Sequence, residues 1–262
     1  MNYKIVVVDE EMIRSICINT DNIKVPIYGL VLVIGTVLGI ILNALLNYKT
    51  IKSKDRPSIV ICNTILNIIC TFGLGSLYTS ITTSFKGVGF SSIGGLAGMY
   101  LSYYVMSKVV SEKNTKMDLE LNFILVIPLI YSLTKIGCLF GSCCYGIEYS
   151  GFGSIEYVGE QAIKTGAVGL RLPIQLIETI AFGIIFIIFS LIRYHARLNS
   201  KYQVYSLCAV CSIMKFCLEF LRYSNNSNIL SVNQLVCIVL LIISVINIIR
   251  QYKSINSYKN IN

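Results

Sequence analysis

The chain has 262 residues, of which 55% are hydrophobic and only 13% are charged, and its mean hydropathy is +0.70. Soluble domains average about 45–50% apolar and about 25% charged residues, so a soluble fold could not bury this excess of apolar surface. The net charge of +9 does not indicate a nucleic-acid partner, because Lys and Arg lie in short segments between apolar runs. The composition predicts an all-α, polytopic integral membrane helical bundle in a lipid bilayer.

Seven apolar stretches approach the roughly 20 residues that a helix needs to cross a bilayer. They occupy residues 27–48, 58–81, 88–107, 121–145, 173–192, 203–222 and 232–249. Glycines interrupt the third and fourth stretches, where a broken or re-entrant segment is an alternative to a continuous helix. The predicted organisation is an extracytoplasmic segment at 1–24, a transmembrane domain at 25–250 and a cytoplasmic tail at 251–262.

The distribution of Lys and Arg predicts the orientation of the chain. Thirteen of these residues lie in segments 49–56, 107–120 and 193–201 and after the last stretch, whereas seven lie in the longer segments of the other side. Short cytoplasmic loops carry an excess of basic residues, so the side with thirteen is predicted to be cytoplasmic. An odd number of spans then places the N-terminus outside and the C-terminus inside.

Ionisable residues within apolar stretches are costly and indicate function. Lys215, Glu219 and Arg222 follow one another at i, i+4 and i+7, which predicts one shared helix face with a surplus of positive charge. Lys135 lies in the fourth stretch, before a Gly- and Cys-rich run that ends at Gly146.

A second group of polar residues begins the fifth and seventh stretches. Arg171, Gln175 and Glu178 repeat the i, i+4, i+7 spacing, and Gln234 begins the seventh stretch. The predicted topology places all of them, with Arg222, in the outer leaflet. Any one pair could be an internal ion pair that fixes helix register, but the common depth favours a single anion-binding site.

Three cysteines, Cys138, Cys143 and Cys144, form a separate group. A CxxxxCC run lacks the paired CxxC spacing of a zinc site, and the one histidine, His195, lies on the predicted cytoplasmic side, so no metal is predicted. Adjacent cysteines rarely bond to each other because the geometry is strained. Packing of small residues is the favoured interpretation, a redox role at an oxidising exterior comes second, and a metal site is a distant third.

Six segments, in chain order between residue 25 and about residue 240, resemble signatures of the bacterial prolipoprotein diacylglyceryl transferase family. They are VPIYGL at 25–30, GFSSIGGLAG at 89–98, KIGC at 135–138 with its continuation to 146, RLPIQLIE at 171–178, KFCLEFLR at 215–222 and SVNQL at 231–235. The third segment is most similar to the branch that reads Gly-Cys-Cys-Tyr-Gly.

This resemblance implies transfer of the diacylglyceryl group of phosphatidylglycerol to the lipobox cysteine thiol of a preprolipoprotein. The reaction would occur at the outer face of the bacterial cytoplasmic membrane and would need no cofactor. The implied catalytic residues are Lys135, Glu219 and Arg222. The implied substrate-binding residues are Tyr28, Gly94, Gly95, Gly146, Gln175, Glu178, Lys215 and Gln234.

Four positions depart from the family pattern. Ile93 stands where the family carries a histidine, Cys138 where it carries asparagine, and Lys135 and Lys215 where it carries arginine. Lys presents a point charge to phosphate, whereas Arg presents a planar fork, and no general base is evident. Two other functions therefore stay open: a non-catalytic relative that binds an anionic lipid, and a membrane thiol oxidoreductase that uses the three cysteines.

Overall fold

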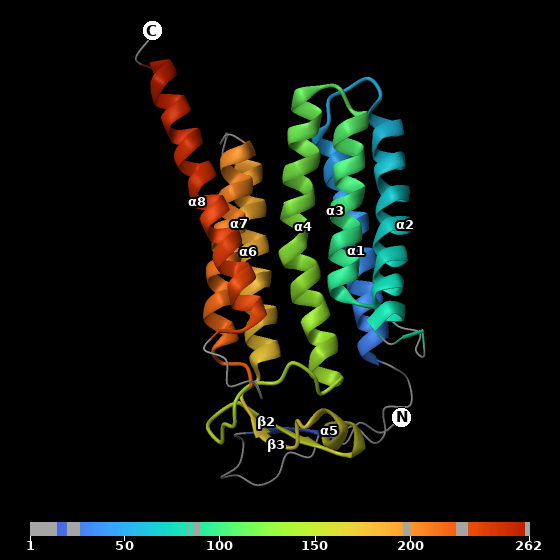
Figure 1. The fold of residues 1–262 in the computed structure, drawn as a ribbon, viewed down its shortest axis with the longest axis vertical. Coiled ribbons are helices and arrows are strands. Elements are labelled where there is room, and N and C mark those ends of the chain that lie inside the picture. The colour runs from blue at the N-terminus through green and yellow to red at the C-terminus, as the bar shows by residue number, and fades with distance from the viewer. Residues whose placement is uncertain are drawn as a thin grey trace.

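The computed structural model describes residues 15–19, 27–82, 84–85, 90–195, 200–223 and 230–259. Within these residues, seven long helices lie alongside one another, and a small sheet with one short helix covers one end (Figure 1). The helices are α1 Ile27–Thr50, α2 Arg56–Thr82, α3 Ser92–Val109, α4 Lys113–Phe140, α5 Glu160–Thr165, α6 Ile174–His195, α7 Ser200–Glu219 and α8 Val232–Lys259. The predicted all-α bundle is confirmed.

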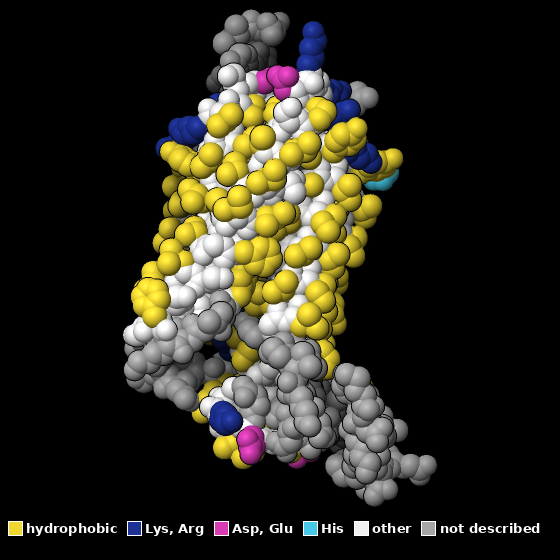
Figure 2. Space-filling view, turned by 90° about the vertical axis from the view of Figure 1, so that its right-hand side faces the viewer, with side chains coloured by type: hydrophobic (Ala, Val, Ile, Leu, Met, Phe, Trp, Pro, Cys, Tyr) yellow, Lys and Arg dark blue, Asp and Glu magenta, His cyan; other side chains and the backbone are white. Residues whose placement is uncertain are grey.

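The surface of the bundle is apolar. Large side chains such as Ile69, Ile180 and Val239 are more than half exposed, and hydrophobic side chains cover the middle of the helices, with Lys and Arg side chains at the edge away from the sheet (Figure 2). Helices α1, α2, α4, α6 and α8 are long and apolar enough to cross a membrane. A chain with such a surface is a membrane protein, because exposing so much contiguous apolar area to water would be unfavourable.

Helices α3 and α7 pack in the same bundle but fall outside this group of five apolar helices. Lys201, Lys215 and Glu219 lower the hydropathy of α7, and Gly, Ser and Tyr residues lower that of α3. Two of these charges, Lys215 and Glu219, are residues that the sequence marks as functional. Seven spans remain a prediction.

The long helices alternate in direction, so that α1, α6 and α8 begin at the end that carries the sheet and the C-terminal part of α8 lies at the opposite end (Figure 1). This arrangement agrees with an odd number of crossings. We predict that Glu160→Cys, at an exposed position on α5, reacts with a membrane-impermeant maleimide in intact cells. Lys54→Cys, in the turn between α1 and α2, should add no label beyond that of the parent chain until the membrane is permeabilised. The opposite labelling pattern would reverse the orientation.

The sheet was not predicted from the sequence. Strand β1 (Ser15–Asn19) pairs in parallel with β2 (Ser154–Val158), and β2 pairs antiparallel with β3 (Gly169–Arg171). Ile155, Tyr157, Ala162 and Ala167 are fully buried in one cluster with Leu139 near the end of α4. This cluster fixes the sheet and α5 against the bundle.

Three predicted boundaries need correction. Helix α4 ends at Phe140 rather than at 145, so residues 141–146 form a loop. Helix α3 begins at Ser92, where the Ser91 side chain accepts a hydrogen bond from the Gly94 amide, and it is continuous through both glycines. Helix α7 ends at Glu219. Arg222 therefore does not share a helix face with Lys215 and Glu219, although it lies close to Glu219 through a turn.

A buried polar network joins α1 to α2. The Asn43 Oδ1 atom accepts hydrogen bonds from the side-chain amides of Asn47 at 3.0 Å, Asn63 at 3.1 Å and Asn67 at 3.5 Å. The Asn122 amide, on α4, donates to Asn47 Oδ1 at 2.9 Å. Hydrogen bonds of this kind hold membrane helices together, because lipid offers the amides no partner.

We expect Asn43→Ala to lower the free energy of unfolding by about 1–2 kcal/mol, because it removes the shared acceptor of three amides. The control is Asn247→Ala, since the exposed Asn247 side chain donates to Ile243 O in its own helix. Denaturant titration of the purified variants measures the difference. Equal midpoints for the two variants would show that the network contributes nothing to packing.

Candidate functional site

The site is built around the buried carboxylate of Glu178, which is 1% exposed on α6. Lys135 Nζ, from α4, lies 2.7 Å from Glu178 Oε2, and Lys215 Nζ, from α7, lies 2.6 Å from Oε1. The Tyr131 hydroxyl donates to Oε1 at 2.7 Å, and the centroid of its ring lies 5.0 Å from Lys135 Nζ and 5.6 Å from Lys215 Nζ. A single carboxylate thus connects three helices at the end of the bundle nearest the sheet.

A second carboxylate, Glu219, extends this network to α8. Its Oε2 atom lies 2.7 Å from Lys215 Nζ, and its Oε1 atom accepts hydrogen bonds from Asn233 Nδ2 at 2.7 Å and Ser231 Oγ at 3.3 Å. Gln234 Oε1 accepts from the Ser231 amide at 2.8 Å. The side chain of Gln234 therefore fixes the start of α8, which in turn holds Glu219.

Arg222 is the cation with the most freedom to bind a ligand. Its Nη1 atom lies 3.6 Å from Glu219 Oε1, and its side chain is 28% exposed. The side chains of Lys135 and Lys215 are 7% and 17% exposed, and each holds a carboxylate oxygen within 2.7 Å. Three cations with two carboxylates leave a formal charge of +1. An anion would meet this charge first at Arg222.

The backbone of Arg222 is held by a close approach of two segments. Arg222 forms an antiparallel bridge with Gly146. A Cβ atom on Gly146 would lie 2.4 Å from the Leu172 carbonyl oxygen, so only glycine fits here without displacing the backbone. The guanidinium Nη2 of Arg222 donates to Cys144 Sγ at 3.0 Å, which joins the cationic site to the cysteine group.

Gln175 and Arg171 fix the loop and the sheet around this site. Gln175 is fully buried, and its Nε2 atom donates to Cys143 O at 2.9 Å and to the Tyr157 hydroxyl at 3.1 Å. Burial raises the pKa of the Tyr157 phenol, which therefore stays protonated. Arg171 lies on β3, donates to the carbonyl oxygens of residues 167 and 168, and lies 3.5 Å from Glu148 Oε1. We therefore assign Arg171 a role in the sheet rather than in the anion site.

Two glycines that were predicted to bind substrate, Gly94 and Gly95, lie on α3. A Cβ on Gly94 would lie 2.5 Å from the Leu74 carbonyl oxygen, and one on Gly95 would lie 2.6 Å from the Phe90 ring. Gly94 therefore allows α3 to pack closely against α2, and Gly95 leaves room for the Phe90 ring. The side chains of Tyr28 and Ile93 lie outside the described residues.

The sequence interpretation missed several residues that contact the predicted ones. Tyr131 lies four residues before Lys135 on α4, so its position on the same helix face could have been read from the spacing. Asn233 and Ser231 lie beside the predicted Gln234. The sequence places Cys144 in a group of three cysteines, but no sequence signal indicates its contact with Arg222.

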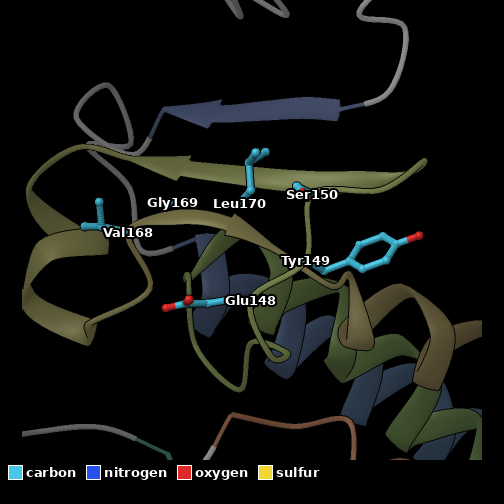
Figure 3. Close-up of a pocket in the computed structure, with 6 residues that line it drawn as sticks. All are labelled: Glu148, Tyr149, Ser150, Val168, Gly169 and Leu170. Carbon is cyan, nitrogen blue, oxygen red and sulfur yellow. The ribbon is translucent and has the colours of Figure 1, made fainter.

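A surface pocket lies on the sheet and not at the charged cluster. It has a volume of about 450 Å³ and is lined by Glu148, Tyr149, Ser150, Val168, Gly169 and Leu170 (Figure 3). None of the predicted site residues lines it. One lining residue, Glu148, pairs with Arg171 of the sheet.

The family model for prolipoprotein diacylglyceryl transferase matches residues 15–250, all but the two ends of the chain. The chain belongs to this family. No curated protein matches it. Members of the prolipoprotein diacylglyceryl transferase family are transferases of lipoprotein biosynthesis, and the match extends over the helices that carry the charged cluster. The family resemblance inferred from six short segments is confirmed, and the similarity to the Gly-Cys-Cys-Tyr-Gly branch stays a prediction.

Proposed function

We propose that the protein transfers the diacylglyceryl group of phosphatidylglycerol to the lipobox cysteine thiol of preprolipoproteins. Family membership supports the reaction class. The observation that supports an anionic lipid donor is the surplus positive charge at Arg222, Lys135, Lys215, Glu178 and Glu219. The apolar surface of the bundle would let the lipid reach this site from the bilayer.

In the proposed reaction, the acceptor thiol loses its proton to water, and its sulfur attacks the glycerol carbon that carries the phosphate. A carbon–sulfur bond forms and the carbon–oxygen bond breaks, so glycerol phosphate leaves with the bonding electron pair. Positive charge fixed beside the departing oxygen stabilises the transition state more than the ground state. Arg222 is the group that we assign to this oxygen, and Lys135 supports it from α4.

The carboxylates would keep these cations in place. Glu178 holds Lys135 and Lys215 at fixed distances, and Glu219 holds Lys215 and Arg222. Because the groups are already oriented, little reorganisation is needed when charge develops on the phosphate. Glu178 and Glu219 are thus positioning residues, and the predicted catalytic role of Glu219 becomes an indirect one.

We further propose that the site faces the outside of the bacterial cytoplasmic membrane, with the N-terminus outside. Complementation tests the function in cells. The gene should restore growth and lipidation of a reporter lipoprotein in a bacterium depleted of its own transferase. A chain that is abundant in the membrane but leaves the reporter unlipidated would favour a lipid-binding protein without transferase activity.

A further inference from the structure

Three cysteine thiols converge beside the charged cluster. Cys138 lies near the end of α4, and Cys143 and Cys144 lie in the loop that follows. Their Sγ atoms all lie within 4.8 Å of one another. The loop folds back over the helix end because the Cys143 amide donates to Cys138 O at 3.1 Å, while Ser142 and Cys144 adopt left-handed backbone angles. The spacing CxxxxCC therefore brings three sulfurs together without a CxxC pair.

These sulfur positions suit a thiophilic metal ion. A zinc–sulfur bond is about 2.3 Å long, which places two sulfurs of a tetrahedral site about 3.8 Å apart. The separations within the group exceed this value by at most about 1 Å. Among the described residues, no fourth Cys, His, Asp or Glu joins the group. Three protein ligands with one open position are typical of catalytic zinc rather than of structural zinc.

Cationic side chains lie beside such a site. The guanidinium of Arg222 lies 3.0 Å from Cys144 Sγ, and Lys135 lies one helical turn before Cys138 on α4. Cys138 is buried and the other two cysteines are half-buried, so water would have limited access to the ion. Neighbouring donors of this kind tune the ligands of metal sites.

We propose that Cys138, Cys143 and Cys144 bind a Zn²⁺ ion whose open position takes the acceptor thiol as a thiolate. The identity of this thiol rests on the proposed function. The chain has one histidine, His195, and it ends α6 at the end of the bundle opposite the sheet (Figure 1). No imidazole is therefore placed to act as a base at the site. Coordination to a metal ion deprotonates a thiol outright.

Because Arg222 contacts Cys144, a thiolate bound to the metal ion and a phosphate bound to Arg222 would lie close together. The acceptor thiol would release its proton to water on binding the ion. Its sulfur would then attack the glycerol carbon of a phospholipid whose phosphate lies against Arg222. The carbon–oxygen bond breaks with its electron pair on the phosphate, and the neutral thioether product leaves the metal. One guanidinium thus connects the metal site to the phosphate site.

Metal content tests the site without any activity. We expect the reduced, purified full chain to hold about one equivalent of Zn²⁺ by elemental analysis, and Co²⁺ in its place to give a thiolate charge-transfer band. Cys143→Ser should lose the metal and the band, whereas the control Cys62→Ser on α2 should keep both. In case Cys143→Ser does not fold, Zn²⁺ should also protect Cys138, Cys143 and Cys144 of the unaltered chain from alkylation. A folded, reduced chain without metal or protection overturns the proposal, as does a native disulfide within the group.

Lipidation of a lipobox peptide in phosphatidylglycerol vesicles tests the role of the metal. Removing Zn²⁺ with a chelator should lower the rate by about 10²-fold or more, as expected when thiol deprotonation is lost, and added Zn²⁺ should restore it. An undiminished rate in metal-free protein overturns the inference and leaves the proposed function standing. A metal-loaded chain that never lipidates the peptide overturns the proposed function and the role of the acceptor thiol, while the metal site stands.

Discussion

Glu178→Gln is expected to lower the free energy of unfolding by about 3–5 kcal/mol. The substitution keeps the shape of the side chain but removes the charge that holds Lys135 at 2.7 Å and Lys215 at 2.6 Å. Breaking a buried ion pair leaves an uncompensated charge in a medium that solvates it poorly. Denaturant titration in detergent, with membrane abundance as a second readout, measures the loss.

The matched control is Glu148→Gln. The Glu148 side chain is 81% exposed and lies 3.5 Å from Arg171, so its ion pair should contribute about 1 kcal/mol or less. The double variant Glu178→Gln with Lys135→Gln removes the uncompensated charge as well, and it should be more stable than Glu178→Gln alone. If Glu178→Gln and Glu148→Gln unfolded at the same denaturant concentration, the proposed network would not exist.

Arg222→Gln is expected to lower the lipidation rate per folded molecule by about 10²–10³-fold. Loss of one preorganised donor to a developing negative charge typically has an effect of this size. Arg222→Lys should retain part of the rate, because the charge persists but the planar fork is lost. Rates are measured on purified, monodisperse protein, so that a loss of folded protein is not counted as a loss of catalysis.

The control for this prediction is Arg193→Gln. Arg193 lies near the end of α6 away from the site and pairs with Asp118 at 2.5 Å. This variant removes the same charge and an ion pair of its own, yet it should leave the rate per folded molecule unchanged. Equal rates for Arg222→Gln and the unaltered chain would show that Arg222 does not act on the phosphate.

The sequence predicted the bundle because long apolar runs have few alternatives to helices in lipid. Ionisable groups within such runs are costly and indicate function, which is why the sequence predicted a site at Lys135, Lys215 and Glu219. It did not predict that Glu178 is the carboxylate at the centre of the network. Glu219 looked central because two cations flank it on its own chain segment. In the structure, Glu178 receives Lys135 and Lys215 from two different helices, a contact that local spacing does not encode.

Two features depend on contacts between distant segments. Strand β1 pairs with β2 across about 140 residues of chain, and such short strands carry little periodic signal. The run 141–146 continues the apolar composition of α4, so hydropathy alone extended the predicted span to 145. The helix ends at Phe140 because the chain turns at Gly141. The same turn produces the convergence of the cysteines.

We propose above that this chain is an active diacylglyceryl transferase. The most direct test incubates the purified chain with phosphatidylglycerol vesicles and a lipobox peptide, and follows the peptide by mass spectrometry. We predict a peptide with a diacylglyceryl thioether on its cysteine, and no product with a Cys→Ser peptide or with phosphatidylcholine vesicles. Bound phosphatidylglycerol with no modified peptide, in an assay where a known family member gives product, would contradict transferase activity and indicate a lipid-binding protein.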